Sequence, residues 1–441
     1  MSDRCFRVAL VRLLLVGIGT CWVCAGSISA RGDDWPQWRG PRRDGVWRES
    51  GIVEKFDSPQ LEIKWRVPIG SGYSGPTVAG GRVYLTDRVT EPEQAERVLC
   101  FDESTGERIW THEYDAVYRN VGYTAGPRAS VTIDNGKAYS LGTMGHLFCL
   151  DAAKGAVLWS KDLDALYGIE MPNWGIACSP LVEGNLVIVV ASAKNACLVA
   201  FDKNTGEEKW KALEDRGQYS APIVVEQAGK RVLVCWTGDN VVGLNPQTGD
   251  VYWQRPMKPV QMPIGAATPV TDGKRLFVSS FYDGSLMLRL TASDKPSVEE
   301  TWRKRGASEQ RTTALHSMIS TPVLDGDYVY GVDSYGEMRC LDAGTGERVW
   351  ESQKAVPKDR WSNIHIVRHG DRYVMFNERG ELIFARLSPT GYEEISRTKL
   401  IEPTKVQLPM RGGVCWSHPA YANKHVFARN DEELVCASMA R

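Results

Sequence analysis

Arginine, aromatic and histidine side chains recur in seven short segments of the chain, and most of these segments run into a proline. Three of them are YRNVGYTAGPR from Tyr118, MPNWGIACSP from Met171 and MRGGVCWSHP from Met410. An arginine beside an aromatic face suits an anionic or planar ligand, because its guanidinium forms bidentate bonds and stacks on rings. The candidate ligand or partner residues are Arg119, Tyr123, Arg128, Trp174, Tyr219, Arg311, His316, Arg360, Trp361, His365, Arg411, Trp416 and His418.

A purely structural role for these side chains stays open. Aromatic residues before a strand also pack against neighbouring elements, and loop arginines also meet carbonyls or water. The three histidines stand at different offsets from their strands, so their spacing predicts no metal site. The sequence has no GxSxG elbow, HExxH motif or P-loop. We therefore expect no catalytic residue and no bound metal.

The eleven cysteines predict no disulfide framework. Three of them, Cys5, Cys21 and Cys24, lie in the first thirty residues. Others, such as those of "LCFD", "FCLD" and "RCLD", stand two residues before an aspartate and so occupy equivalent places in successive repeats. Equivalent positions of neighbouring repeats lie beyond the roughly 7 Å Cα separation that a disulfide allows. No CxxC pair or CxxCH motif occurs, so neither zinc nor a c-type haem is predicted.

One unit repeats along the chain. Five segments place Asp or Asn eight residues before Trp and Gly four residues after the Asp or Asn: DESTGERIW from Asp102, DAAKGAVLW from Asp151, DKNTGEEKW from Asp202, NPQTGDVYW from Asn245 and DAGTGERVW from Asp342. Asp or Asn opens a hairpin turn by bonding backbone amides, and Gly supplies a positive φ. The tryptophan then lies on the returning strand, where its ring can dock on a neighbouring sheet.

A second signal precedes each hairpin: a proline, a short strand, a glycine-containing turn and a strand rich in Val, Tyr, Leu and Phe. Together the two signals give four short antiparallel strands per unit, which is one propeller blade. The leading prolines are Pro76, Pro127, Pro180, Pro222, Pro269, Pro322 and Pro419. The last interval is about twice the others and holds a degenerate unit from Ile364, with Ile395 near the tryptophan position. The chain is therefore predicted to contain eight such units.

The last unit has no room for a fourth strand before Arg441. The segment LEIKWRV, residues 61–67, supplies that strand and its Trp65 from the other end of the chain. This closure leaves no free sheet edge between the first and last units. The fold class predicted is all-β: an eight-bladed β-propeller of four-stranded antiparallel blades, closed by an N-terminal strand.

The Asp-x-x-Thr-Gly-x-x-x-Trp unit resembles the tryptophan-docking repeat of the pyrroloquinoline quinone (PQQ)-like β-propeller superfamily, over residues 60–441. In this resemblance blade five departs, with a longer TASDKPSVEETW turn. The docking tryptophans it implies are Trp65, Trp110, Trp159, Trp210, Trp253, Trp302 and Trp350. The superfamily includes PQQ-dependent alcohol and sugar dehydrogenases as well as non-enzymatic exported propellers, such as the scaffold of outer-membrane β-barrel assembly.

The first thirty residues have the pattern of a secretory signal peptide. Basic residues precede an apolar run from Leu13 to Val23, which is shorter than the roughly 20 residues of a spanning helix, and small residues follow. The residues before Cys21 and Cys24 match a lipoprotein box poorly, so no lipid anchor is expected. The domains predicted are a signal peptide (1–30), an extension that packs on the propeller (31–58), and the propeller itself (59–441). The mature chain is expected to be periplasmic or extracellular, without a transmembrane segment.

Two functions follow from the resemblance. A PQQ dehydrogenase needs Ca²⁺ held by several oxygens, a general base, a flat platform for the quinone and cations for its carboxylates. The chain is shorter than such enzymes and lacks their adjacent-cysteine disulfide. We therefore expect a non-catalytic, monomeric scaffold that binds a protein or polymer at the channel mouth and needs no cofactor, with a compact PQQ- and Ca²⁺-dependent dehydrogenase as the alternative. The 53 basic and 54 acidic residues, a net charge of -1, give no reason to expect nucleic acid.

Overall fold

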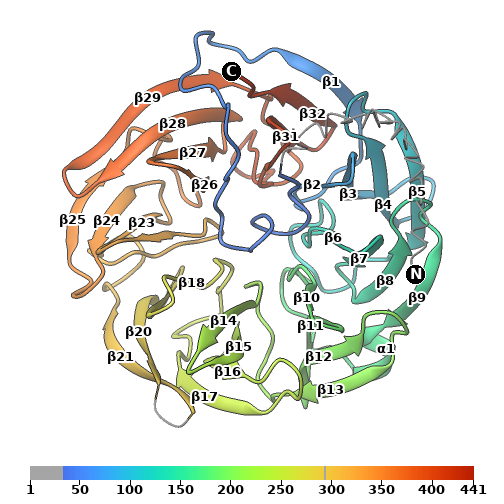
Figure 1. Cartoon of the computed structure of the whole chain (residues 1–441), viewed down its shortest axis with the longest axis horizontal. Helices are drawn as coiled ribbons and strands as arrows, with labels where there is room; N and C mark the ends of the chain where they lie inside the picture. The colour runs from blue at the N-terminus through green and yellow to red at the C-terminus, as the bar shows by residue number, and fades with distance from the viewer. Residues whose placement is uncertain (1–32, 293–294) are drawn as a thin grey trace, which may run out of the picture. The chain divides into compact units, whose positions relative to one another are not determined.

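A computed structural model describes residues 33–292 and 295–441. The predicted signal peptide lies outside these residues. The strands form eight four-stranded sheets, arranged around a ring in Figure 1. The predicted eight-bladed, all-β propeller is confirmed. Among the described residues, no helix is both long and apolar enough to cross a membrane.

Each blade runs from an inner first strand to an outer fourth strand. Blades one to four are β2–β5 (Thr77–Ala79, Arg82–Val89, Ala95–Asp102, Arg108–Asp115), β6–β9 (Thr132–Asp134, Lys137–Leu141, His146–Asp151, Val157–Asp162), β10–β13 (Leu181–Glu183, Leu186–Ala193, Ala196–Asp202, Glu208–Ala212) and β14–β17 (Ile223–Gln227, Lys230–Trp236, Asn240–Leu244, Val251–Pro256). Blades five to eight are β18–β21 (Val270–Thr271, Arg275–Ser280, Gly284–Ala292, Pro296–Lys304), β22–β25 (Val323–Asp325, Tyr328–Val332, Met338–Asp342, Arg348–Ser352), β26–β29 (Ile364–His369, Arg372–Asn377, Glu381–Ser388, Gly391–Lys399) and β30–β32 (Ala420–Ala422, His425–Arg429, Glu433–Ser438) with β1 (Ile63–Pro68). One short helix, α1 (Leu163–Tyr167), lies between β9 and β10.

The N-terminal strand closes the ring. β1 pairs antiparallel with β32, and Trp65 lies opposite Cys436 in that register. The last blade therefore has the order β1-β32-β31-β30, with its outer strand taken from the start of the chain. Closure in this way pairs the backbone groups of β32 that would otherwise form a free edge.

The docking tryptophans hold neighbouring blades together through the turn glycines. In the first seam, Trp65 Nε1 donates to Glu103 O at 2.9 Å, and a Cβ on Gly106 would lie 2.8 Å from the Trp65 ring. Gly106 also has φ +74°. The glycine is thus needed twice, once for its backbone conformation and once because the ring leaves no room for a side chain.

Three seams lack the contact between a tryptophan ring and a turn glycine. Between blades six and seven only the hydrogen bond remains, because Trp350 Nε1 donates to Ser388 O at 2.8 Å while Gly391 of that turn is clear of the ring. In the other two seams different residues make the contact. In blade five the sequence between β20 and β21 holds no glycine, and Trp253 Nε1 instead donates to Gln227 Oε1 at 3.1 Å. Gln227 Nε2 donates to Thr291 O at 2.9 Å and so carries the contact into blade five. Between blades seven and eight, where Ile395 replaces the tryptophan, Phe56 of the extension stacks on Phe384 with ring centroids 4.7 Å apart.

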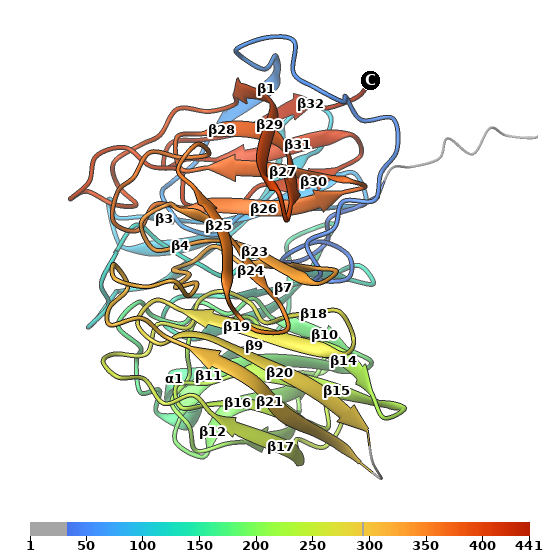
Figure 2. The ribbon, with the colours of Figure 1, turned by 90° about the vertical axis from the view of Figure 1, so that its left-hand side faces the viewer.

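The antiparallel order gives the ring two faces. Turns between first and second strands and between third and fourth strands lie at one end, which we name the sealed face. Connections between second and third strands and the loops between blades lie at the other end, which we name the open face. The extension, residues 33–58, bonds to the sealed face, where Trp35 N donates to Val78 O and Trp47 N donates to Arg368 O, both at 2.8 Å. This blue segment crosses the centre of the ring in Figure 1 and follows one side of it in Figure 2.

Candidate functional site

The loops of the open face meet at the ring axis around a cavity of about 140 Å³, which we name the inner cavity. Its walls are mostly aromatic and small apolar side chains. They come from seven of the loops that lead into blades, from strand β26 through His365, and from the extension, as expected for a site on a propeller axis. The lining residues are Trp38, Tyr73, Tyr123, Arg128, Trp174, Ala177, Ser179, Tyr219, Ala221, Ala266, Met318, Ile319, His365, Trp416 and His418.

A repeat position that the sequence analysis did not use supplies much of this wall. Six lining residues stand three places before a leading proline: Tyr73, Ala177, Tyr219, Ala266, Ile319 and Trp416. Six blades therefore present the same position to the axis, some with a large side chain and others with a methyl group. The alanines leave the space that the rings enclose. A fixed offset from the prolines would have identified Tyr73 from sequence.

The extension forms the floor of the inner cavity. Trp38 Nε1 donates to Thr268 Oγ1 at 2.8 Å, and its ring meets the ring of His418 at 4.2 Å and 88°. Arg43 fixes this segment from beneath by donating to three carbonyls, those of Ser179, Pro180 and Pro222, at 2.7–3.0 Å. The cavity is therefore closed toward the sealed face.

Two buried histidines stand beside the floor with rings 5.8 Å apart. His365 Nε2 lies 2.8 Å from Trp416 O, and His418 Nε2 lies 2.9 Å from Ser130 Oγ. Burial lowers the pKa of His365 to about 4 and lowers the pKa of His418 well below its ordinary value. Both rings are therefore neutral near pH 7 and position Trp416 and Ser130 through hydrogen bonds.

Aromatic rings also form the entrance. Tyr123 lies at its centre, with ring centroids 5.8 Å from Trp174, 6.3 Å from Trp416 and 6.4 Å from Trp361. Beyond these rings an outer cavity of about 410 Å³ opens between Asn120, Asn173, Met262, Phe281 and Trp361. The two cavities share Tyr123, Trp174 and Met318, so one passage leads from the open face to the floor.

Among the residues that the structure describes, Arg128 is the one charged residue that lines the inner cavity. Its guanidinium donates to Gly126 O at 2.6 Å, Gly122 O at 2.9 Å and Tyr123 O at 2.5 Å, and lies 4.9 Å from the centre of the Tyr73 ring. It makes no ion pair with any described carboxylate. Its hydrogen bonds serve the loop that carries Tyr123, so its first role is to shape the entrance.

The structure thus brings together eight of the thirteen residues singled out from the sequence. Seven line the inner cavity and Trp361 lines the outer one: Tyr123, Arg128, Trp174, Tyr219, His365, Trp416 and His418 form the inner group. Trp38, Tyr73 and Met318 were missed. Trp38 carried no usable signal, because its place at the axis depends on how the extension crosses the ring.

Five of the residues singled out from the sequence do not line either cavity. Arg119 and Arg311 are exposed on their loops. Arg360 lies outside the entrance, 4.8 Å from the Trp361 ring and 3.7 Å from Glu309. Arg411 pairs with buried Glu378 and lies 2.9 Å from Asp359, so its charge is already neutralised inside the fold. These arginines belong to the segments that the sequence analysis singled out, but their side chains do not reach the ring axis.

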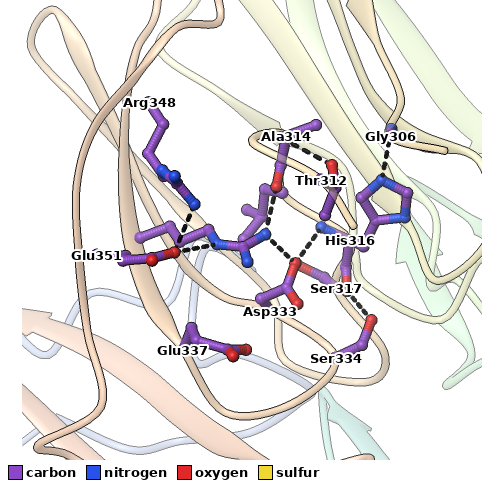
Figure 3. Close-up of polar contacts among 12 residues, drawn as sticks. Gly306, Thr312, Ala314, His316, Ser317, Asp333, Ser334, Glu337, Arg348 and Glu351 are labelled. Atoms are coloured by element: carbon purple, nitrogen blue, oxygen red, sulfur yellow. Dashed lines mark hydrogen bonds and ion pairs between the residues drawn. The ribbon is translucent and has the colours of Figure 1, made fainter. Parts of the chain in front are cut away.

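His316, the fifth, lies in a buried cluster behind the entrance. Its Nδ1 donates to Phe281 O at 2.8 Å, and burial lowers its pKa. Its backbone N donates to Asp333 Oδ2 at 3.0 Å, and Asp333 pairs with Arg339 at 2.5 Å (Figure 3). Burial, the largest effect, raises the pKa of Asp333 to about 7 although Arg339 opposes this shift. The cluster holds the loop that supplies Met318 to the cavity, which is a structural role.

Residues 94–352, more than half of the chain, match the family described as outer membrane protein assembly factor BamB. The chain belongs to the BamB family. The BamB of Burkholderia pseudomallei is 25% identical over 382 residues, which are 82% of this chain and 89% of that protein. The quinoprotein alcohol dehydrogenase PedH of Pseudomonas putida is 32% identical, but over 145 residues, which are 30% of this chain and 23% of that protein.

Solved structures agree on the fold of this BamB-family chain. BamB from Moraxella catarrhalis aligns with a TM-score of 0.58 and 17% identity, covering 85% of this chain and 98% of that one. The quinohemoprotein alcohol dehydrogenase from Comamonas testosteroni aligns with a TM-score of 0.64 and 14% identity, covering 92% of this chain and 80% of that one. Both solved proteins therefore share the propeller fold with this chain, and the side chains at the axis have to distinguish a scaffold from a dehydrogenase.

The axis of this BamB-family chain does not fit PQQ with Ca²⁺. Calcium takes six to eight oxygen ligands, carboxylates among them. No aspartate or glutamate of the described part of the chain lines either cavity. Within residues 33–292 and 295–441, no group of three or more His, Cys, Asp or Glu is placed to hold a metal ion. The quinone carboxylates would find Arg128 alone, whose N–H groups already bond to loop oxygens.

Proposed function

We propose that this chain is an exported scaffold that binds a protein partner on its open face, carries out no reaction and uses no cofactor. The observation that carries the proposal is the aromatic passage at the axis, whose neighbouring acids and bases are held inside the fold. Glu378 is paired with Arg411, and Asp333 with Arg339. None of these four residues lines either cavity, so they stabilise loops and do not reach a ligand in the passage.

Exposed apolar side chains on the open-face loops support a protein as the partner. Met410 is 68% exposed, Leu166 54%, Val260 53%, Val117 50% and Val406 48%. They belong to four different inter-blade connections, one of which contains α1. Burying such side chains at an interface contributes about 25 cal/mol per Å² of apolar surface. Polar ligands would gain nothing from these positions.

The location of the partner follows from the leader and the family. The signal-like residues 1–30 favour export, and the family description, outer membrane protein assembly factor, favours a partner in the cell envelope. The near-neutral net charge adds no electrostatic selection for nucleic acid. A protein of the envelope is therefore the partner to seek.

Site-specific photo-crosslinking in intact cells tests the proposal. A photoreactive amino acid is placed at Met410 or Val260, and at Val349 of the outer strand β25 as the control, since Val349 is also exposed at 44%. We expect one discrete crosslinked protein from positions 410 and 260 and none from 349. Crosslinks from 349 alone, or from no position, would overturn the proposal. So would PQQ- and Ca²⁺-dependent dye reduction by the purified chain with an alcohol or sugar as donor.

A further inference from the structure

We infer that the inner cavity receives one uncharged aromatic side chain of the protein partner, inserted from the open face past Tyr123 and Trp174. This inference rests on the proposed function and names the chemical group that the partner contributes. Four features carry it: the size of the cavity, the nature of its walls, its closed floor, and two free amides at its entrance.

The volume of the inner cavity limits the occupant to one or two rings. It measures about 140 Å³, and an apolar protein cavity of about 150 Å³ holds one benzene molecule. A Phe, Tyr or Trp side chain therefore fits, with a larger ring extending toward the outer cavity. A three-ring quinone with three carboxylates exceeds this space.

The walls select an aromatic group over an aliphatic or a sugar-like one. Tyr73, Tyr219 and Trp416 contribute rings from three blades, and aromatic pairs attract through edge and face contacts beyond simple burial. The wall has few polar atoms, and two of them are engaged: Ser179 Oγ accepts from Ser130 N at 2.9 Å, and Tyr73 Oη donates to Gln407 O at 2.9 Å. Trp416 Nε1 is buried without a hydrogen-bond partner among the described residues, so it offers a ligand a single donor. Sugar hydroxyls would lose their water without gaining enough partners.

Because the floor is closed, the occupant can enter only from the open face, either as a free molecule or as a side chain of a bound partner. Trp38 ends the passage, and Arg43 locks the segment that carries it. A side chain that projects from a partner lying across the open face reaches this depth. The pocket is formed before the partner arrives, so its rings need no reordering.

The outer cavity offers groups that match a peptide backbone. Asn120 and Asn173 line it, both are exposed, and their side-chain amides have no hydrogen-bond partner among the described residues. Each amide can donate to a peptide carbonyl and accept from a peptide N–H. Two such groups beside an aromatic entrance favour a ring carried by a polypeptide over a free small molecule.

Blocked amino acids test the inference on the purified full chain. N-acetyltryptophanamide and N-acetylphenylalaninamide carry the ring together with peptide bonds, N-acetylleucinamide carries no ring, and indole carries no peptide bond. Binding is followed by saturation-transfer NMR and titration. We expect the aromatic amides to bind saturably and at least about threefold more tightly than the leucine amide. We also expect N120A/N173A to weaken the aromatic amides but not indole.

Filling the cavity gives the matched control. In Ala266→Phe or Ala177→Leu a larger side chain occupies the inner cavity, whereas Ala153→Phe adds a ring to an exposed turn of the sealed face. The first two should weaken N-acetyltryptophanamide at least about tenfold, and the third should not. Thermal melting of each variant confirms folding, and the two filling variants act at different blades in case one fails to fold.

Three results would overturn the inference. They are no saturable binding by any aromatic amide, binding of N-acetyltryptophanamide to Ala266→Phe and Ala177→Leu as tight as to the native chain, or binding of the leucine amide as tight as that of the aromatic amides. Competition by micromolar PQQ would overturn it as well. These failures are separable from failure of the proposed function. If positions 410 and 260 still crosslink a partner in the cavity-filled variants, the open face binds a protein without inserting a ring.

Discussion

The two faces of the ring use the same repeat under different constraints. On the sealed face, tight turns must present a glycine to a tryptophan ring, as Gly106 does to Trp65, and the extension bonds to the strand ends. On the open face, the loops have only to reach the next blade. Their sequences are free to differ, and they carry the aromatic passage and the exposed apolar side chains. The repeat thus stabilises the sealed face of the propeller and leaves the open face available for binding.

Loss of the Arg43 anchor should give the largest effect. In Arg43→Met, three buried carbonyls lose their donor, and we expect the free energy of unfolding to fall by about 3–5 kcal/mol. Urea denaturation followed by tryptophan fluorescence measures this change. Arg42→Met, at an exposed neighbour, is the control. A loss below about 1 kcal/mol would show that the extension does not seal the axis.

A turn that packs on a tryptophan ring should tolerate replacement of its glycine less well than a turn of the same blade that packs on nothing. A Cβ at Gly155 would lie 2.6 Å from the Trp110 ring, whereas a Cβ at Gly136 would meet nothing within 4 Å, and both residues have positive φ, +71° and +75°. Gly136→Ala should cost about 1 kcal/mol from backbone conformation alone. Gly155→Ala should cost about 1–3 kcal/mol more, because the ring must move. Equal losses in thermal unfolding would contradict the double role of the glycine.

The buried histidines should make stability fall in acid. For His365 the folded-state pKa of about 4 lies below the unfolded value of about 6.5. The unfolded chain therefore binds more protons as the pH drops from about 6.5 toward 4, and His365 alone contributes a loss of about 2 kcal/mol by pH 5. The measurement is the difference in unfolding free energy between the native chain and His365→Gln at pH 7.5 and pH 5. In that difference the opposite slope of Asp333 cancels. A gap that is the same at both pH values would contradict the neutral, buried state of His365.

The smallest effect on stability should come from the exposed apolar residues of the open-face loops. Met410→Ser and Val260→Ser remove exposed apolar side chains, so the free energy of unfolding should change by less than about 0.5 kcal/mol. Partner crosslinking from neighbouring open-face positions should nonetheless decrease in both variants. A large loss of stability would mean that these residues serve the fold and not a partner.

Sequence determined the ring because every blade has to solve the same problem. The turn with Asp or Asn, Gly and a tryptophan eight residues later can be recognised in five blades, and the strand-like segment 61–67 with its Trp65 revealed the closing strand. Tyr123, Trp174, Tyr219 and Trp416 were also accessible from sequence, because they stand in the loops that lead into the blades. Tyr73 stands at the same distance from its proline as Tyr219 and Trp416, so the repeat would have identified it as well.

Tertiary structure alone decided which side chains are committed and which are free. Arg411 and His316 stand in the predicted mouth segments, yet Glu378 and Phe281 O, far away in the sequence, take their hydrogen bonds. Trp38 belongs to no repeat, and it reaches the axis because Arg43 finds carbonyls of two blades. Repeats are local and can be seen in one dimension. Ion pairs, the closure of the cavity by the extension, and the cavities themselves depend on residues far apart in the sequence, which come together only in the folded chain.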